Sequence, residues 1–119
     1  MYSARLLDYF QNPRNAGDVP EATAIAEISN PVCGDTLRLS VKIDAGRITS
    51  IRFKAKGCVA SMACGSAITE LVQGKSIPEA LSIKREDLIA AVDGLPQAST
   101  HAAQLALDTL AAALRQVKT

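Results

Sequence analysis

Two of the three cysteines stand in sequence contexts that suit a reactive or metal-binding thiol. Cys33 lies in the segment NPVCGD, residues 30–35, between a proline that stiffens the approaching backbone and an expected strand. This pattern predicts a thiol exposed on a tight turn, with the carboxylate of Asp35 two residues away. Cys58 follows Gly57 where an expected strand passes into a helix, and the free amides of a helix N-terminus favour a thiolate. Taken alone, each cysteine could equally be a small buried residue.

His101 is the only histidine, and we expect it in the first turn of the final helix. The positive end of the helix dipole disfavours imidazolium there, and neutral imidazole is the form that binds metals. The alternative is an ordinary solvated surface side chain. Cys64 comes six residues after Cys58, so on one regular helix the two side chains would lie on different faces. We therefore expect Cys64 to pack in the core.

The composition excludes several classes of protein. The 119 residues carry 13 Lys plus Arg against 12 Asp plus Glu, and this net charge of +1, with few aromatics, argues against a nucleic-acid partner. The longest unbroken apolar stretch, residues 110–114, is far below the ~20 residues of a membrane span. Charges at Arg5, Asp8 and Arg14 argue against a secretion signal. Three cysteines cannot close a disulfide framework, which indicates a reducing, cytoplasmic location.

Hydrophobic periodicity predicts strands followed by helices. Residues 36–44 alternate cleanly, residues 44–47 supply a turn, and Ile51, Phe53 and Ala55 resume the alternation, so the two strands form an antiparallel hairpin. Residues 23–29 are a weaker third strand. A helix over residues 3–11 stops at Asn12-Pro13, and a second helix over residues 61–73 ends at Gly74. Ser76 and Glu79 match a capping box at the start of a short helix, and residues 85–92 form another helical piece. The last helix has about 17 residues, with Ser99 or Thr100 as its cap.

These elements predict a single α+β domain over residues 1–119. Its small antiparallel three-stranded sheet is covered on one face by helices. The final helix carries one apolar stripe, which we expect to pack lengthwise on the sheet.

Several of these segments together resemble one family, the U-type iron–sulfur cluster assembly scaffolds (IscU, the N-terminal domain of NifU, and SufU). The likeness runs nearly end to end through LLDYFQNPRN (residues 6–15), NPVCGD (30–35), FKAKGC (53–58), TELVQGKS (69–76) and the closing helix. The resemblance implies a NifU-like scaffold without enzymatic activity. Such a scaffold receives sulfur from a cysteine desulfurase, combines it with iron, and passes the cluster to carrier or acceptor proteins.

By position, the residues that match the family's ligands are Cys33, Asp35, Cys58 and His101. The resemblance implies that they hold a [2Fe-2S] cluster, iron, or a zinc ion in its place. Asp35 looks like the family residue associated with a cluster labile enough to transfer. The resemblance leaves open whether two chains share one cluster as a homodimer.

The chain departs from the family's pattern at Ala102, where relatives normally have a third cysteine beside the histidine. A [2Fe-2S] cluster needs four protein ligands, preferably thiolates, whereas two thiolates, an imidazole and a carboxylate also suit tetrahedral zinc or a single iron. Cys64 is one substitute ligand to consider. The alternative function is a zinc-containing sulfur relay, in which Cys33 or Cys58 accepts a persulfide from a cysteine desulfurase.

Overall fold

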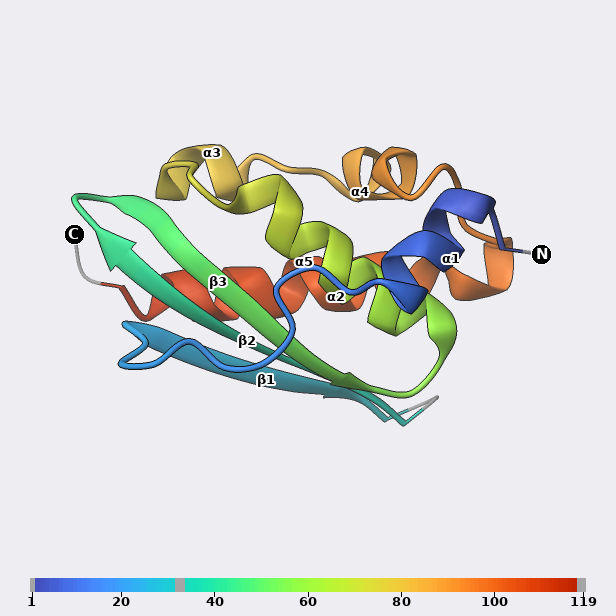
Figure 1. The fold of residues 1–119 in the computed structure, drawn as a ribbon, viewed down its shortest axis with the longest axis horizontal. Helices are drawn as coiled ribbons and strands as arrows, with labels where there is room; N and C mark the ends of the chain where they lie inside the picture. Colours follow the sequence, from blue (N-terminus) through green and yellow to red (C-terminus); the bar gives the residue numbers. More distant parts are fainter. Residues whose placement is uncertain (1, 32–33, 118–119) are drawn as a thin grey trace.

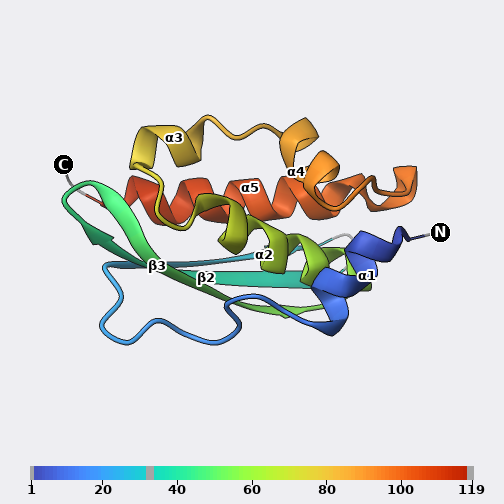
Figure 2. The same ribbon diagram turned by 45° about the horizontal axis from the view of Figure 1, so that its top comes forward.

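Three consecutive strands, with helices on one face of them, make up the fold of residues 2–31 and 34–117, which the computed structural model describes. The strands pair antiparallel in the order β1-β2-β3, and all the helices lie on the same side of the sheet (Figures 1 and 2). In chain order the elements are α1 (Ala4–Gln11), β1 (Ala24–Asn30), β2 (Asp35–Asp44), β3 (Arg47–Lys56), α2 (Val59–Val72), α3 (Ile77–Leu81), α4 (Arg85–Ala91), the 3₁₀ turn η1 (Gln97–Ser99) and α5 (Thr100–Arg115). The predicted α+β class and three-stranded sheet are confirmed.

The hairpin of β2 and β3 supplies most of the apolar face of the sheet. Leu39 pairs with Phe53 and Val41 with Ile51, and all four side chains are buried. Ala45 and Gly46 both have positive φ, as the two-residue turn that matches strand twist requires. The alternation of apolar residues therefore predicted the hairpin correctly.

Strand β1 is also present, but Ile25, one of its two isoleucines, faces away from the core. Ala24 and Ala26 are buried, whereas Ile25 is 41% exposed. Because alternate residues of a strand point to opposite faces, burying the two alanines turns Ile25 outward. This explains why its apolar residues gave a weak sequence signal.

Helix α2 is almost fully buried between the sheet and the other helices. It lies close to the strands at Gly65, where an added Cβ would come within 2.9 Å of both Leu37 and Phe53. The helix begins at Val59, two residues before the expected start, because Cys58 serves as its N-cap. Gly74, with φ +85°, follows its end as predicted.

Helix α5 has 16 residues and packs beside α2 over β1 and β2. Ser99 is the N-cap residue, one of the two expected positions, but no side-chain hydrogen bond caps the helix. The Thr100 hydroxyl instead donates a hydrogen bond to the carbonyl of Gln97 in η1. Helices α3 and α4 lie on the outer side of this layer, away from the sheet (Figure 2). Among the described residues, no helix combines the length and apolar character needed to cross a bilayer.

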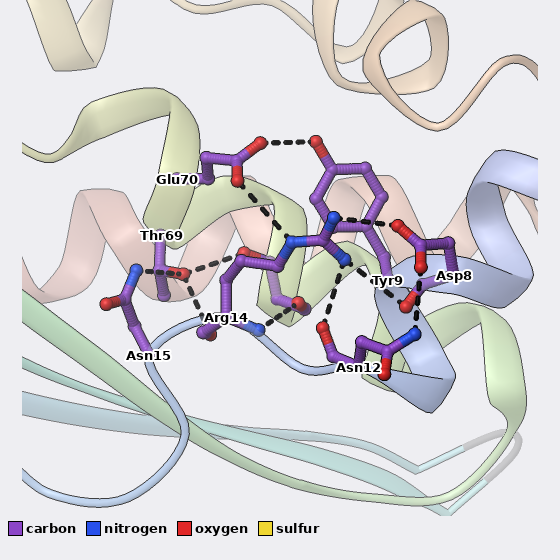
Figure 3. Close-up of polar contacts among 8 residues, drawn as sticks. Asp8, Tyr9, Asn12, Arg14, Asn15, Thr69 and Glu70 are labelled. Carbon is purple, nitrogen blue, oxygen red and sulfur yellow. Dashed lines mark hydrogen bonds and ion pairs between the residues drawn. The ribbon is translucent and has the colours of Figure 1, made fainter.

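The segment after α1 is fastened to α2 by a group of polar side chains around Arg14 (Figure 3). The Arg14 guanidinium lies over the Tyr9 ring at 4.3 Å, and it pairs with Asp8 at 2.7 Å and with Glu70 at 3.5 Å. The Tyr9 hydroxyl donates a 2.6 Å hydrogen bond to Glu70, and the Arg14 amide donates to the Ser66 hydroxyl. These contacts fix the position of the N-terminal segment on the surface of α2.

Candidate metal centre

Three side chains that could bind a metal meet where β2, α2 and α5 begin. Asp35 is the first residue of β2, Cys58 caps α2, and His101 lies in the first turn of α5. These starting points lie at the same end of the molecule (Figure 1). Asp35 Oδ2 lies 3.4 Å from Cys58 Sγ and 3.3 Å from His101 Nε2, and the three ligand atoms all lie within 4.8 Å of one another. The fourth predicted ligand, Cys33, falls outside the described residues.

Asp35 is the buried member of the group, with only 1% of its surface exposed. Its Oδ1 accepts a hydrogen bond from the Cys58 amide at 3.1 Å, and its Oδ2 accepts one from the Ser61 hydroxyl at 2.6 Å. Burial raises the pKa of this carboxyl, but the hydrogen bonds from Ser61 and Cys58, with that of His101, outweigh burial and lower the pKa overall. The carboxylate is therefore ionised at neutral pH.

Cys58 uses its sulfur as the cap of α2. Its Sγ accepts a hydrogen bond at 3.4 Å from the amide of Ser61, the position that a serine or aspartate oxygen fills in most helices. The side chain is half-buried. The first turn of the helix thus fixes where the sulfur lies relative to Asp35.

Gly57 makes room for the carboxylate. It has a φ of +128°, and an added Cβ would overlap Asp35 Oδ1 and come within 2.7 Å of Cγ. A glycine is required here both for its backbone conformation and for the close approach. Sequence reasoning named Gly57 only as the neighbour of Cys58.

Ser61 is a site residue that the sequence analysis missed. It is 1% exposed, and its hydroxyl contacts both Asp35 and Cys58. The available signal was its spacing, because Ser61 stands three residues after the cap, at a position whose free amide a cap side chain accepts.

The two remaining candidates occupy different environments. His101 is partly accessible, with 32% of its side chain exposed, so an ion could reach it from solvent. Cys64 is fully buried, as predicted, and burial raises the pKa of its thiol to about 12. That burial leaves Cys64 without access to an ion at the surface and removes it as a substitute ligand. Ala102, beside His101, is also buried.

The spacing of the three donor atoms suits a small tetrahedral ion. Zinc–ligand bonds of about 2.0–2.3 Å place neighbouring ligands about 3.5 Å apart. The separations of 3.4 and 3.3 Å from Asp35 Oδ2 match this spacing. Sulfur, nitrogen and oxygen donors together are typical of zinc and iron sites. The three residues could supply three ligands to such an ion and leave one position for a further ligand.

Comparisons with known proteins agree with the fold and with the resemblance. A family model described as the NifU-like N terminal domain matches residues 1–119. The iron–sulfur cluster assembly scaffold protein IscU 1 of Archaeoglobus fulgidus is 42% identical over 114 residues, covering 96% of this chain and 74% of that protein. The IscU scaffold protein of Escherichia coli K12 is 37% identical over 121 residues, covering 98% and 94%.

Solved structures show the same architecture. The crystal structure of an iron–sulfur cluster assembly scaffold protein for the SUF system from Fervidobacterium islandicum AW-1 superposes with a TM-score of 0.81 at 25% identity, covering 95% of this chain and 96% of that one. A NifU-like N-terminal structure from Brucella abortus also gives 0.81, at 20% identity, and shares the fold. The chain belongs to the NifU-like N-terminal domain family, that of the U-type scaffolds.

Proposed function

We propose that this protein is a scaffold for iron–sulfur cluster assembly that binds iron and sulfide at Asp35, Cys58, His101 and Cys33. One observation carries the proposal, which is the convergence of a carboxylate, a thiol and an imidazole within 4.8 Å of one another. Relatives that carry the name of IscU scaffold proteins, at 42% and 37% identity, support the same function.

Each donor has a distinct role in this proposal. The thiolates of Cys33 and Cys58 are soft ligands that bind iron strongly, and the imidazole of His101 completes a nitrogen–sulfur set. The carboxylate of Asp35 is a harder ligand and binds the ion least tightly, so it is the one that exchanges when cargo leaves. The chemistry is exchange of ligands on iron, and no general base is needed.

The proposal implies one partner that supplies sulfur before assembly and others that take the cluster after it. A cysteine desulfurase would supply the sulfur, and carrier or acceptor proteins would take the finished cluster. Both follow from the role that scaffolds have among the relatives, and both would approach the exposed side of His101.

Anaerobic reconstitution tests the proposal. The protein would be incubated with ferrous iron and sulfide, and we expect a visible chromophore with about two irons per chain or per dimer. Cys58→Ala and His101→Ala should lose most of this absorbance. Arg47→Ala, at an exposed position on the opposite end of β3 from Gly57, should keep it. Wild-type protein without any chromophore would contradict the scaffold function.

The alternative is a zinc-containing sulfur relay, which is favoured by the buried Ala102 at the position where the family resemblance implies a third cysteine. In that reaction the thiolate of Cys33 or Cys58 attacks the outer sulfur of a donor persulfide. A new sulfur–sulfur bond forms, and the donor cysteine leaves as a thiolate. Retained zinc with a gain of one sulfur atom, measured by mass spectrometry, would support the relay over the scaffold.

A further inference from the structure

The hydroxyl of Ser61 contacts two of the three described metal-ligand candidates at once. Its Oγ donates to Asp35 Oδ2 at 2.6 Å and lies 3.4 Å from Cys58 Sγ. Among the described residues, this 2.6 Å contact is the shortest hydrogen bond of the Asp35 carboxylate. The Cys58 amide lies 3.1 Å from it and His101 Nε2 lies 3.3 Å from it. Ser61 is 1% exposed, so water does not compete for these contacts.

Ser61 makes one contact with the site through its backbone and two through its side chain. Its amide donates to Cys58 Sγ, and any residue other than proline at this position of α2 would supply that amide. Its hydroxyl contacts Cys58 Sγ and holds Asp35 Oδ2, which is the oxygen that faces both the thiol and the imidazole. Removing the hydroxyl therefore removes its contacts with the carboxylate and with the sulfur, and leaves in place the amide that the sulfur caps.

We propose that Ser61 is a positioning residue that orients the Asp35 carboxylate toward the ion, an inference that rests on the proposed function. A carboxylate held at only one oxygen can rotate about its Cβ–Cγ bond. The Cys58 amide holds Oδ1 and Ser61 holds Oδ2, so together they fix the plane of the group. Groups that orient a metal ligand in this way change metal affinity by about 10- to 100-fold when they are removed.

A double-mutant cycle tests the inference through the affinity for Zn²⁺, measured by competition with a chromophoric chelator. We expect Ser61→Ala to weaken binding about tenfold in the wild-type background. Because Ser61 acts through Asp35, the same change should have no further effect in Asp35→Ala. An equal loss in both backgrounds, or no loss in either, would overturn the inference.

The visible spectrum of bound Co²⁺ gives a second readout that general destabilisation does not move. In Ser61→Ala we expect the d–d bands to shift, because they report the coordination geometry that the carboxylate helps to set, while a thiolate-to-cobalt band persists because Cys58 still binds. This measurement decides the matter if Asp35→Ala binds zinc too weakly for the cycle. A d–d spectrum identical to that of the wild type would count against Ser61.

Ser66→Ala is the matched control. Ser66 is another fully buried serine of α2, but its hydroxyl accepts a hydrogen bond from the Arg14 amide instead of contacting the site. The zinc affinity of Ser66→Ala should stay within about twofold of that of the wild type. Wild-type protein that binds no zinc or cobalt would contradict the proposed function itself, whereas wild-type affinity in Ser61→Ala would overturn only the role of Ser61.

Discussion

The backbone of Gly57 lies directly against the carboxylate of Asp35, 22 positions earlier in the chain. A side chain at Gly57 would come within 2.7 Å of Asp35 Cγ and within 3.0 Å of its Cα. The amide that follows, that of Cys58, donates to the same carboxylate. The junction between β3 and α2 is therefore shaped around one acidic side chain.

Gly57→Ala should disrupt both stability and metal binding. The added methyl group displaces Asp35 and forces a non-glycine residue into a φ of +128°, so we expect the free energy of unfolding to fall by about 3 kcal/mol or more. Zinc binding should be lost with it. Both are measurable by denaturant unfolding and by zinc titration.

Gly74→Ala is the control for backbone strain alone. Gly74 also has a positive φ, +85°, but nothing lies within 4 Å of its added Cβ. We expect a loss of about 1 kcal/mol and unchanged zinc affinity. If the two variants behaved alike, close packing against Asp35 would not be the reason for the glycine at position 57.

Zinc should stabilise the folded protein, because the described donors come together only when the chain is folded. At a free zinc concentration of about one hundred times Kd, the free energy of unfolding should rise by about 2.7 kcal/mol. For a domain of this size that corresponds to about 10 °C in Tm, and chelation should reverse it.

His101→Ala should remove most of the increase in the free energy of unfolding that zinc produces. A hundredfold loss of affinity would leave about 0.4 kcal/mol at the same zinc concentration. Gln104→Ala, an exposed position one turn further along α5, should retain the full increase. An undiminished increase in His101→Ala would exclude the imidazole as a ligand.

Cys64 should make the protein less stable at high pH. Burial raises the pKa of its thiol from 9.0 to about 12, so the folded state holds this proton more tightly than the unfolded chain does. The stabilisation is complete below pH 9 and is lost as the pH rises through the interval up to 12. By about pH 10 the loss should be about 1.4 kcal/mol.

The free energy of unfolding of the wild type and of Cys64→Ala would be measured by denaturant unfolding at about pH 8 and about pH 10. The alanine variant starts from a lower stability because it leaves a cavity, but its decline with pH should be smaller. Parallel curves for the two proteins would mean that Cys64 ionises as readily in the folded state as in the unfolded chain.

Arg14→Ala should destabilise the attachment of α1 without affecting metal binding. The change removes the contact with the Tyr9 ring and hydrogen bonds to the carbonyls of Asp8 and Asn12. We expect the free energy of unfolding to fall by about 1–2 kcal/mol. Arg47→Ala breaks a more exposed pair with Glu79 and should cost only a small fraction of that. Equal losses would show that neither the Tyr9 contact nor the hydrogen bonds to the two carbonyls add to stability.

The sequence predicted those elements whose apolar pattern matches their burial. The hairpin of β2 and β3 follows from strict alternation, and the capping box at Ser76 and Glu79 is present as predicted. The start of α2 was placed two residues late, because a cysteine is not an ordinary helix cap. The cap position of α5, Ser99, was among those expected, but no side chain caps the helix, and the Thr100 hydroxyl bonds instead to η1, an element that has no sequence pattern of its own.

The sequence identified the candidate ligands of the site but not the residues that position them. Asp35, Cys58 and His101 were named from residue type and expected position, and the structure brings them together. The roles of Gly57 and Ser61 depend on contacts with a residue more than 20 positions away. Such contacts leave no periodic pattern, so only the folded chain reveals them.

The sulfur of Cys58 closes the first turn of α2 and also faces the other two ligand candidates. Under the proposed function, this one atom thus serves both the helix and the bound cluster. An acceptor protein that drew this sulfur outward would also uncap the helix, so cluster delivery and fraying of the helix end would be coupled events. Amide exchange at Ser61 would report on that coupling.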